Sequence, residues 1–258
     1  MLLFFDIDGT LIDEETHTIP ASTFSALQRA HARGHMNFIN TGRTLCNLDE
    51  RLHALPLDGW VCGCGTEILF QGKSILSYSL THVESLSVVD FCHARKLSGF
   101  FEGRDRISLD PQLPSSRGTE AIRSYCEKKG ILGSTRDPDF TMVKFFIYTS
   151  DLEDIAAIEN MPGLPFACID RGHGGWEVIP RGYSKQSGME CIREKTGMQH
   201  EDLVAFGDSR NDLSMLRAAA VSVCMGQAPE DVKAQCTFVT GTPGQDGIEQ
   251  ALLHLHLI

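Results

Sequence analysis

The sequence lacks several features that mark specialised classes of protein. Its 258 residues contain no apolar run near the roughly 18 residues that a bilayer-spanning helix needs. The acids Asp6 and Asp8 interrupt the apolar stretch that a signal peptide would continue. Internal repeats and low-complexity tracts are also absent. We therefore expect a globular, cytoplasmic protein without a membrane partner.

Basic residues are scarce relative to acids. The chain has 23 Lys plus Arg against 34 Asp plus Glu, which gives a formal net charge of -11. Such a surface repels a phosphate backbone on average, so we expect no nucleic-acid partner. Hydrophobic residues make up 42% and charged residues 22%, as in ordinary soluble proteins. The length fits one large α/β domain or two smaller ones.

The nine cysteines show neither the spacing of a disulfide framework nor that of a zinc site. Cys62 and Cys64 lie close together, but no second pair with suitable spacing follows them. We expect free thiols in a reducing compartment.

Short apolar runs alternate with amphipathic stretches at both ends of the chain. The expected strands are 2–7, 35–40, 59–63, 203–207, 221–226 and 236–240. The expected helices between them are 22–33, 44–55, 211–219 and 229–235. This alternation predicts an α/β fold with a doubly wound parallel sheet and helices packed on its faces.

The middle of the chain has a different pattern. Two strand-like runs flank Gln71-Gly72, which is typical of a hairpin rather than a crossover. Helical and strand-like stretches follow for about a hundred residues, the size of a small domain. We therefore expect the doubly wound core to be interrupted by an inserted α+β domain.

Two acids stand one residue apart at the end of the first predicted strand. If the strand continued through Asp6 and Asp8, both side chains would point to one face. Two buried carboxylates there require a cation, a shared proton or a function. Gly9 permits close backbone approach and Thr10 adds a hydroxyl. The alternative is a pair of solvated loop acids.

Polar groups also follow two other predicted strands. Thr41, Gly42 and Arg43 offer a hydroxyl, backbone amides and a guanidinium suited to anions. The segment 208–212 is an acid-rich turn directly after a buried strand. Since parallel strands deliver their carboxyl ends to one edge of a sheet, these groups should meet there. The mixture suits an oxyanion ligand and a divalent metal with hard oxygen ligands, for which Mg²⁺ is the natural choice.

Four motifs in this order resemble those of the haloacid dehalogenase-like (HAD) phosphatases, and among them the Cof-type sugar-phosphate phosphatases with a type IIB α/β cap. They are DIDGT at 6–10, Thr41 in NTGR, Lys185 in GYSKQSGM and GDSRND at 207–212. The resemblance implies a Rossmann-like HAD core over 1–81 and 182–258 and a substrate-specificity cap over 82–181. It also implies Mg²⁺-dependent hydrolysis of phosphate monoesters of small metabolites, foremost sugar phosphates.

The resemblance assigns roles to particular residues. Asp6 would attack phosphorus and form an aspartyl-phosphate. Asp8 would act as general acid and then as general base. Mg²⁺ would bind the Asp6 carboxylate, the Asp8 backbone carbonyl and Asp208. Thr41 and Lys185 would hold the phosphoryl oxygens in the transition state.

Further roles follow from the same resemblance. Gly42, Arg43 and Asn211 would complete the substrate-binding set, and Asp212 would orient Lys185 or metal-bound water. For Lys185, Asp212 and Arg43 a structural role is the alternative. A lysine at a helix start is ordinarily exposed, Asp212 suits the first turn of a helix, and Arg43 could pair with an acid.

In the cap, Lys144, Trp176 and Glu177 are candidates for substrate contact, as a cation, a sugar-stacking face and a hydroxyl acceptor. Lys144 also fits the exposed side of a strand. One departure concerns Cys64-Gly65-Thr66, where many relatives have Asn-Gly-Ala. Any contact made by that asparagine is therefore in doubt here.

Other functions remain open at this point. A phosphomutase differs chiefly in whether a sugar hydroxyl or water receives the phosphoryl group. A phospho-aspartate signalling or binding protein uses a similar sheet and metal, but would lack an acid at the place of Asp8. A dehalogenase would also lack it, because a halide leaves without a proton. We expect a small phosphorylated metabolite as partner and a monomer or weak homodimer; the preferred metabolite cannot be read from the motifs.

Overall fold

The computed structural model describes residues 1–258 and divides into two compact units. The first, which we call the core unit, consists of Met1–Gly42, Asp49–Leu76 and Ser184–Ile258. The second, the insert unit, consists of Arg43–Leu48 and Ser77–Tyr183. No helix combines the length and the apolar character that crossing a membrane requires. All nine cysteines are free.

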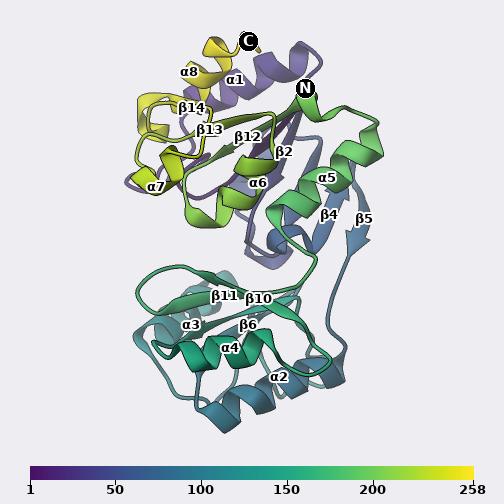
Figure 1. Cartoon of the computed structure of the whole chain (residues 1–258), viewed down its shortest axis with the longest axis vertical. Coiled ribbons are helices and arrows are strands. Elements are labelled where there is room, and N and C mark those ends of the chain that lie inside the picture. The colour runs from purple at the N-terminus through teal and green to yellow at the C-terminus, as the bar shows by residue number, and fades with distance from the viewer. The chain divides into compact units, whose positions relative to one another are not determined.

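The core unit is built on an eight-stranded sheet in the order β14-β13-β12-β1-β2-β3-β4-β5 (Figure 1). Its strands are β1 Leu2–Phe5, β2 Met36–Asn40, β3 Gly59–Cys62, β4 Glu67–Phe70, β5 Lys73–Ser77, β12 Leu203–Gly207, β13 Val221–Cys224 and β14 Phe238–Val239. All pairs from β14 to β3 are parallel, whereas β3 and β4 are antiparallel. The predicted doubly wound parallel sheet is thus confirmed, with the predicted β4–β5 hairpin added at one edge.

Helices cover both faces of this sheet. They are α1 Ala21–Ala32, α5 Lys185–Thr196, α6 Leu213–Ala218, α7 Glu230–Lys233 and α8 Gly247–His254. Leu2 and Phe4 pack into one apolar cluster with buried residues of α5 and α6. Phe5 has the opposite strand parity and stacks on Phe206 at 4.5 Å between ring centroids. Helices α1 and α8 contact each other and lie across the sheet from α5 and α6 in Figure 1.

The predicted helix over 44–55 is wrong. The segment forms two short 3₁₀ helices, Leu45–Asn47 and Glu50–Ala54. Leu48 adopts an extended backbone between them, and the Asp49 side chain accepts a hydrogen bond from the N–H of Arg51. This cap starts a new helical turn instead of continuing the first, so the hydrophobic periodicity never becomes an α-helix.

The insert unit has a six-stranded sheet in the order β10-β11-β9-β6-β7-β8. Its strands are β6 Ser98–Glu102, β7 Ile107–Leu109, β8 Leu132–Ser134, β9 Lys144–Tyr148, β10 Phe166–Asp170 and β11 Gly175–Pro180. Its helices are α2 His82–Arg95, α3 Arg117–Lys129 and α4 Leu152–Glu159. Most neighbouring strands are antiparallel, which agrees with the predicted α+β texture.

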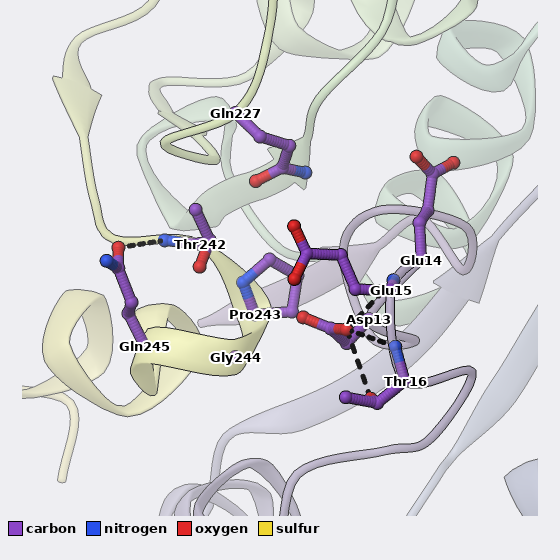
Figure 2. A pocket seen from close by; sticks show the side chains of 9 residues that line it. All are labelled: Asp13, Glu14, Glu15, Thr16, Gln227, Thr242, Pro243, Gly244 and Gln245. Carbon is purple, nitrogen blue, oxygen red and sulfur yellow. Dashed lines mark hydrogen bonds between the residues drawn. The ribbon is translucent and has the colours of Figure 1, made fainter.

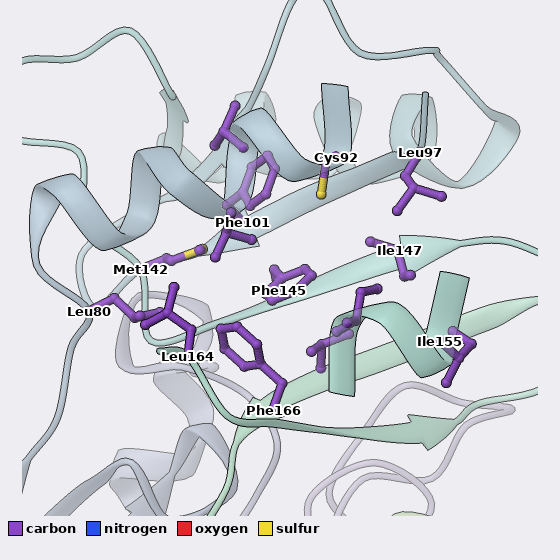
Figure 3. Packing of buried hydrophobic residues seen from close by; sticks show 14 of the residues in the cluster. Leu80, Cys92, Leu97, Phe101, Met142, Phe145, Ile147, Ile155, Leu164 and Phe166 are labelled. Atoms are coloured by element: carbon purple, nitrogen blue, oxygen red, sulfur yellow. The ribbon is translucent and has the colours of Figure 1, made fainter. Parts of the chain in front are cut away.

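The two faces of the insert sheet carry separate cores. Phe101, Phe145 and Val178 belong to a cluster with buried residues of α2 and α4 (Figure 3). The neighbouring residues Phe100 and Phe146 belong to a second cluster that includes Cys126 of α3. Since successive strand residues alternate in direction, residues next to Phe101, Phe145 and Val178 point to this second face.

Candidate active site

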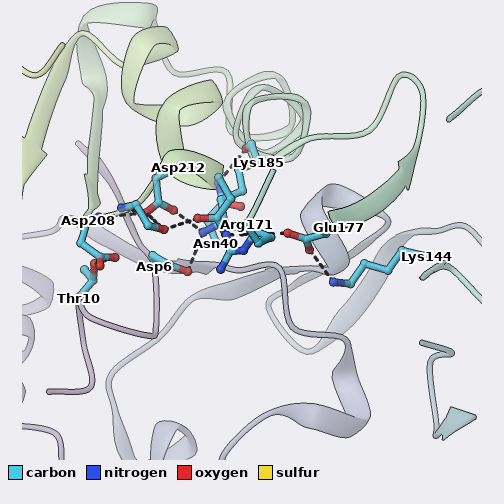
Figure 4. Close-up of polar contacts among 11 residues, drawn as sticks. Asp6, Thr10, Asn40, Lys144, Arg171, Glu177, Lys185, Asp208 and Asp212 are labelled. Atoms are coloured by element: carbon cyan, nitrogen blue, oxygen red, sulfur yellow. Dashed lines mark hydrogen bonds and ion pairs between the residues drawn. The ribbon is translucent and has the colours of Figure 1, made fainter. Parts of the chain in front are cut away.

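Asp6 directly follows β1. Its N–H donates to the carbonyl oxygen of Phe206 at 3.0 Å, which extends the pairing of β1 with β12 by one residue. The residue is 5% exposed. Its Oδ1 lies 2.7 Å from Nζ of Lys185 (Figure 4). The sheet thus presents this carboxylate at the carboxyl end of its central strand, in contact with a cation.

Asp8 lies in a tight loop rather than on a continued strand. The strand ends at Phe5, and the N–H groups of Leu11 and Ile12 both donate to the carbonyl oxygen of Ile7. Asp8 is half-buried. The expected same-face spacing on a strand therefore does not apply, and the loop sets the position of Asp8.

Gly9 brings this loop against the last motif. Its φ is +73°, and an added Cβ would lie 2.3 Å from Oδ2 of Asp208. Both the left-handed backbone and the close approach require glycine. The Thr10 hydroxyl then donates to Oδ1 of Asp208 at 3.4 Å. The first and last motifs therefore form one site.

Lys185 is the first residue of α5, yet it is only 1% exposed. The expectation of a surface lysine is excluded by this burial. Ser184 caps the helix: its hydroxyl accepts from the N–H of Ser187 at 3.0 Å. Nζ of Lys185 contacts Oδ1 of Asp212 at 2.5 Å as well as Asp6. Two carboxylates thus offset the unfavourable position of a cation at a helix N-terminus.

Asp212 connects Lys185 to the loop that follows β12. Its Oδ2 accepts from the N–H groups of Asp208 at 3.0 Å and Ser209 at 2.9 Å. Asn211 Oδ1 accepts from the Ser209 hydroxyl. Asp212 closes a 3₁₀ turn, Arg210–Asp212, just before α6. Its carboxylate therefore orients a cation and two backbone donors at once.

Thr41 follows β2 and is buried. Its N–H donates to the carbonyl oxygen of Val61 at 2.8 Å, and its own carbonyl accepts from Cys64 N–H at 3.0 Å. Gly42 closes the same stretch of the core unit, whereas Arg43 groups with the insert unit. The guanidinium of Arg43 donates to the carbonyl oxygen of Asn47 at 3.2 Å.

Two further side chains support the site but were not predicted. The Asn40 amide donates to the carbonyl oxygen of Lys185 at 2.8 Å and so ties the end of β2 to the start of α5. The Gln227 amide donates to the carbonyl oxygen of Gly9 at 2.5 Å. Asn40 carried a weak signal, a polar residue ending an apolar strand, whereas Gln227 lies in a loop without any motif.

Burial and like charge govern the titration of the site. Burial and the neighbouring Asp212 raise the pKa of Asp6 to about 7, although Lys185 acts in the opposite direction. Burial, Asp212 and Asp6 raise the pKa of Asp208 to about 8. Burial lowers the pKa of Lys185, but Asp212 and Asp6 outweigh it and raise that pKa above its ordinary value. The site therefore holds more negative charge than its lysine compensates.

The buried carboxylates of the site suit a divalent cation. Carboxylate oxygens of Asp6, Asp208 and Asp212 all lie within 4.8 Å of one another, and all three residues are buried. The oxygens of Asp212 already bind Lys185 and backbone N–H groups. Asp6 and Asp208 are therefore the better-suited metal ligands, and hard carboxylate oxygens are those that Mg²⁺ prefers.

Comparison with known proteins identifies the family. The model of the haloacid dehalogenase-like hydrolases matches residues 3–252. The chain belongs to this family. It is similar to the 5-amino-6-(5-phospho-D-ribitylamino)uracil phosphatase YcsE of Bacillus subtilis, with 24% identity over 98% of this chain and 94% of the relative. It is also similar to the pyridoxal phosphate phosphatase YbhA of Escherichia coli, with 27% identity over 100% and 98%.

A solved structure extends the comparison to the insert unit. The HAD subclass IIB sugar phosphatase BT4131 is 30% identical, with a TM-score of 0.82 over 100% of this chain and 99% of that one. The resemblance inferred from the four motifs is thus confirmed. With relatives named as phosphatases, the protein is a phosphoric monoester hydrolase of the HAD family.

A cavity of about 650 Å³ is lined by residues 13–16, which come shortly after the first motif, by Gln227 and by residues 242–245 (Figure 2). Gln227, which binds Gly9, contributes to its wall. Asp13, Glu14 and Glu15 line it as well. Three acids repel a phosphate group, so this cavity is a poor place for a phosphorylated substrate.

In the insert unit, Lys144 is buried rather than exposed. Its Nζ lies 2.6 Å from Glu177 Oε1 (Figure 4). It also lies 2.8 Å from Glu102 Oε1. By strand parity, all three residues point to the face of the insert sheet away from α2 and α4. Trp176 packs against the cluster on the opposite face, and its Nε1 donates to the carbonyl oxygen of Thr149. Lys144, Glu102 and Glu177 thus form one ionic cluster, and Trp176 is not part of it.

Proposed function

We propose that this HAD phosphatase depends on Mg²⁺ and hydrolyses phosphate monoesters of small metabolites, foremost sugar phosphates, through an aspartyl-phosphate on Asp6. The observation that carries the proposal is the buried contact between Asp6 and Lys185, with Asp212 behind the lysine and Asp208 beside the first motif. The similarity to a named sugar phosphatase supports the substrate class.

In the first step, a carboxylate oxygen of Asp6 attacks phosphorus. The bond from phosphorus to the leaving oxygen breaks, and Asp8 donates a proton to that oxygen so that it leaves as an alcohol. Lys185 holds an oxygen of the phosphoryl group in the transition state, when negative charge shifts toward it. Asp212 keeps the ammonium group in place during this step.

In the second step, Asp8 is a carboxylate and takes a proton from water. The water oxygen attacks phosphorus, and the bond between phosphorus and Asp6 breaks. Inorganic phosphate leaves, Asp6 is again a carboxylate and Asp8 is again protonated. Asp8 therefore begins the next turnover in the form that can donate a proton to the leaving oxygen.

The carboxylates of Asp6 and Asp208 and the backbone carbonyl of Asp8 would hold Mg²⁺. When bound, the ion supplies positive charge against which an anionic phosphate can approach an anionic nucleophile. The proposal follows from the excess of negative charge in the site and the oxygen donors there.

We also propose that Thr41, Gly42, Arg43 and Asn211 complete the contacts to the phosphorylated substrate. Thr41 and Gly42 directly follow β2, the strand next to β1 in the core sheet. The domain spanning 82–181 would serve as the cap that selects the rest of the metabolite, while 1–81 and 182–258 carry the chemistry. Lys144 and Glu177 remain candidates for this selection.

A panel of phosphorylated metabolites tests the proposal. Purified protein is incubated with sugar phosphates, pyridoxal phosphate and nucleotides. One series contains roughly 5 to 10 equivalents of Mg²⁺ relative to substrate, and the other contains a chelator instead. Phosphate release from sugar phosphates that stops with chelator is the expected result. Isomerisation without release would instead identify a phosphomutase. Stable phosphorylation of Asp6 without turnover would identify a phospho-aspartate signalling protein.

A further inference from the structure

Residues 43–48, which we call the strap, leave the core unit immediately after Thr41 and Gly42. By their contacts they belong to the insert unit, although β2 precedes them and the core-unit segment from Asp49 follows them. The chain therefore passes between the two units four times, after residues 42, 48, 76 and 183. One of these passages starts next to the residue proposed to bind phosphate.

The strap is fastened to the insert unit by backbone and side-chain contacts. The Cys46 N–H donates to the carbonyl oxygen of Arg104 at 3.0 Å, and its thiol donates to the carbonyl oxygen of Gly103 at 3.7 Å. The Cys46 side chain also packs against the cluster that contains Phe100 and Cys126. Burial raises the pKa of this thiol, so Cys46 acts as an apolar anchor rather than as a thiolate.

Helix α3 adds a pair of polar contacts one helical turn apart. The hydroxyl of Tyr125 donates to Oδ1 of Asn47 at 2.7 Å. Nζ of Lys129 donates to the carbonyl oxygen of Leu48 at 2.8 Å and to the Tyr125 hydroxyl at 3.3 Å. These two side chains stand at i and i+4 on the same face of α3, so they hold two consecutive strap residues.

The other end of the strap leads directly to the substrate-binding turn. Arg43 donates to the carbonyl oxygen of Asn47, which folds the strap back on itself, and Thr44 is buried. Gly42 is the single residue between Arg43 and Thr41, so the strap leaves little free chain on that side. A displacement of α3 and its strand cluster must therefore be taken up at Gly42 or passed to Thr41.

We propose that Tyr125 and Lys129 are positioning residues: by fixing the strap to α3, they set the conformation of the Thr41–Gly42 turn that receives the phosphoryl group. The proposal rests on the proposed role of Thr41 in phosphate binding. In this proposal Tyr125 acts through Asn47 and Lys129 acts through Leu48.

The test compares Tyr125→Phe/Lys129→Met with the wild-type protein. Lys128→Met is the matched control, because Lys128 is an exposed neighbour on α3 and the substitution removes the same charge. Hydrogen exchange measures the amides of residues 45–48, and steady-state kinetics measures KM, kcat and inhibition by inorganic phosphate. We expect faster exchange in the strap, a rise of roughly 5- to 30-fold in KM and in the phosphate inhibition constant, and a smaller change in kcat.

A conservative variant separates positioning from loss of folding. Lys129→Arg keeps a cationic donor for the Leu48 carbonyl, so in a Tyr125→Phe background it should restore most of the phosphate inhibition constant. Faster strap exchange with unchanged KM and phosphate inhibition would overturn the proposal, as would unchanged strap exchange in the double variant. A wild-type protein without phosphatase activity would contradict the proposed function instead, and the exchange measurement would still report on the strap.

Discussion

Nζ of Lys185 lies 2.7 Å from Oδ1 of Asp6, with the lysine side chain 0% and the aspartate side chain 7% exposed. A buried carboxylate in this position would ordinarily take up a proton, and burial does raise the pKa of Asp6. The lysine opposes that shift and so favours the anionic form, which is the form able to attack phosphorus. Under the proposed function, the contact prepares Asp6 as the nucleophile and places Lys185 where it can bind phosphate.

Asp6→Asn should lower turnover roughly 10³-fold or more, because an amide oxygen cannot form a stable acyl-phosphate. The change is nearly isosteric, so the thermal unfolding temperature should stay within a few degrees of wild type. Steady-state release of phosphate from p-nitrophenyl phosphate measures the loss. Asp231→Asn, an exposed acid paired with Arg210, is the control and should leave turnover unchanged. Turnover of Asp6→Asn at the wild-type rate would refute the nucleophile assignment.

Asp8→Asn should discriminate between leaving groups. An alkyl alcohol needs a proton to leave, whereas p-nitrophenolate leaves readily as an anion. We expect a loss in kcat/KM of roughly 10²- to 10⁴-fold for a sugar phosphate and a loss at least about tenfold smaller for p-nitrophenyl phosphate. Equal losses on the two substrates would remove the general-acid role from Asp8 and leave it a metal-binding or loop-forming residue.

The raised pKa values of Asp6, about 7, and Asp208, about 8, predict how stability depends on pH in metal-free protein. Both exceed the ordinary value of 3.8, so the folded state binds more protons than the unfolded state between about pH 4 and pH 8. The free energy of unfolding should therefore fall as pH rises through this window, by at most about 1.4 kcal/mol per pH unit for each group. Lys185 keeps its charge throughout and adds no slope there.

Urea unfolding of the protein in the presence of chelator, at about pH 5, 6, 7 and 8, measures how the free energy of unfolding changes with pH. Asp208→Asn should flatten this dependence, because one of the two titrating groups is gone. Mg²⁺ should stabilise wild-type protein more at pH 8 than at pH 5, since the ion competes with protons for the same oxygens. Equal stabilisation at both pH values would argue against metal binding by Asp6 and Asp208.

The sequence was sufficient for those parts of the molecule where local pattern decides structure. Short apolar runs such as 203–207 favour buried strands, and the acids or hydroxyls that follow them meet at one edge because parallel strands share a direction. Asp6, Asp208 and Asp212 were predicted in this way, whereas Lys185 was predicted only through the family resemblance of its motif. The structure brings these residues into contact.

The sequence did not predict features that depend on contacts between residues far apart in the chain. The periodicity of 44–55 suits an α-helix, but contacts of Cys46 and Asn47 with the insert unit and the cap at Asp49 divide it. Strands β7 and β8 have three residues each, too few for alternation to be seen. Gln227 binds Gly9 from 218 positions away, a pairing that no local pattern contains.

The burial of Lys144 was missed for the same reason, and it leads to a prediction about stability. Glu102 and Glu177 come from strands β6 and β11, on either side of β9, and all three side chains are about 5% exposed. Lys144→Met would leave two buried carboxylates without this cation, at a cost of about 3 to 5 kcal/mol in the free energy of unfolding. Lys73→Met changes an exposed residue of β5 and serves as the control. It should lower the free energy of unfolding by less than about 1 kcal/mol.

The double variant Lys144→Met/Glu102→Gln decides whether charge or packing causes this loss. It removes one of the two carboxylates, so it should be more stable than Lys144→Met alone. Burial already raises the pKa of Glu102 in the presence of the lysine, so Lys144→Met should also lose less stability at pH 5 than at pH 8, because the carboxyl can then bind a proton. Urea unfolding at the two pH values measures both effects. A pH-independent loss, unchanged in the double variant, would mean that Lys144 stabilises the insert sheet through its aliphatic packing alone.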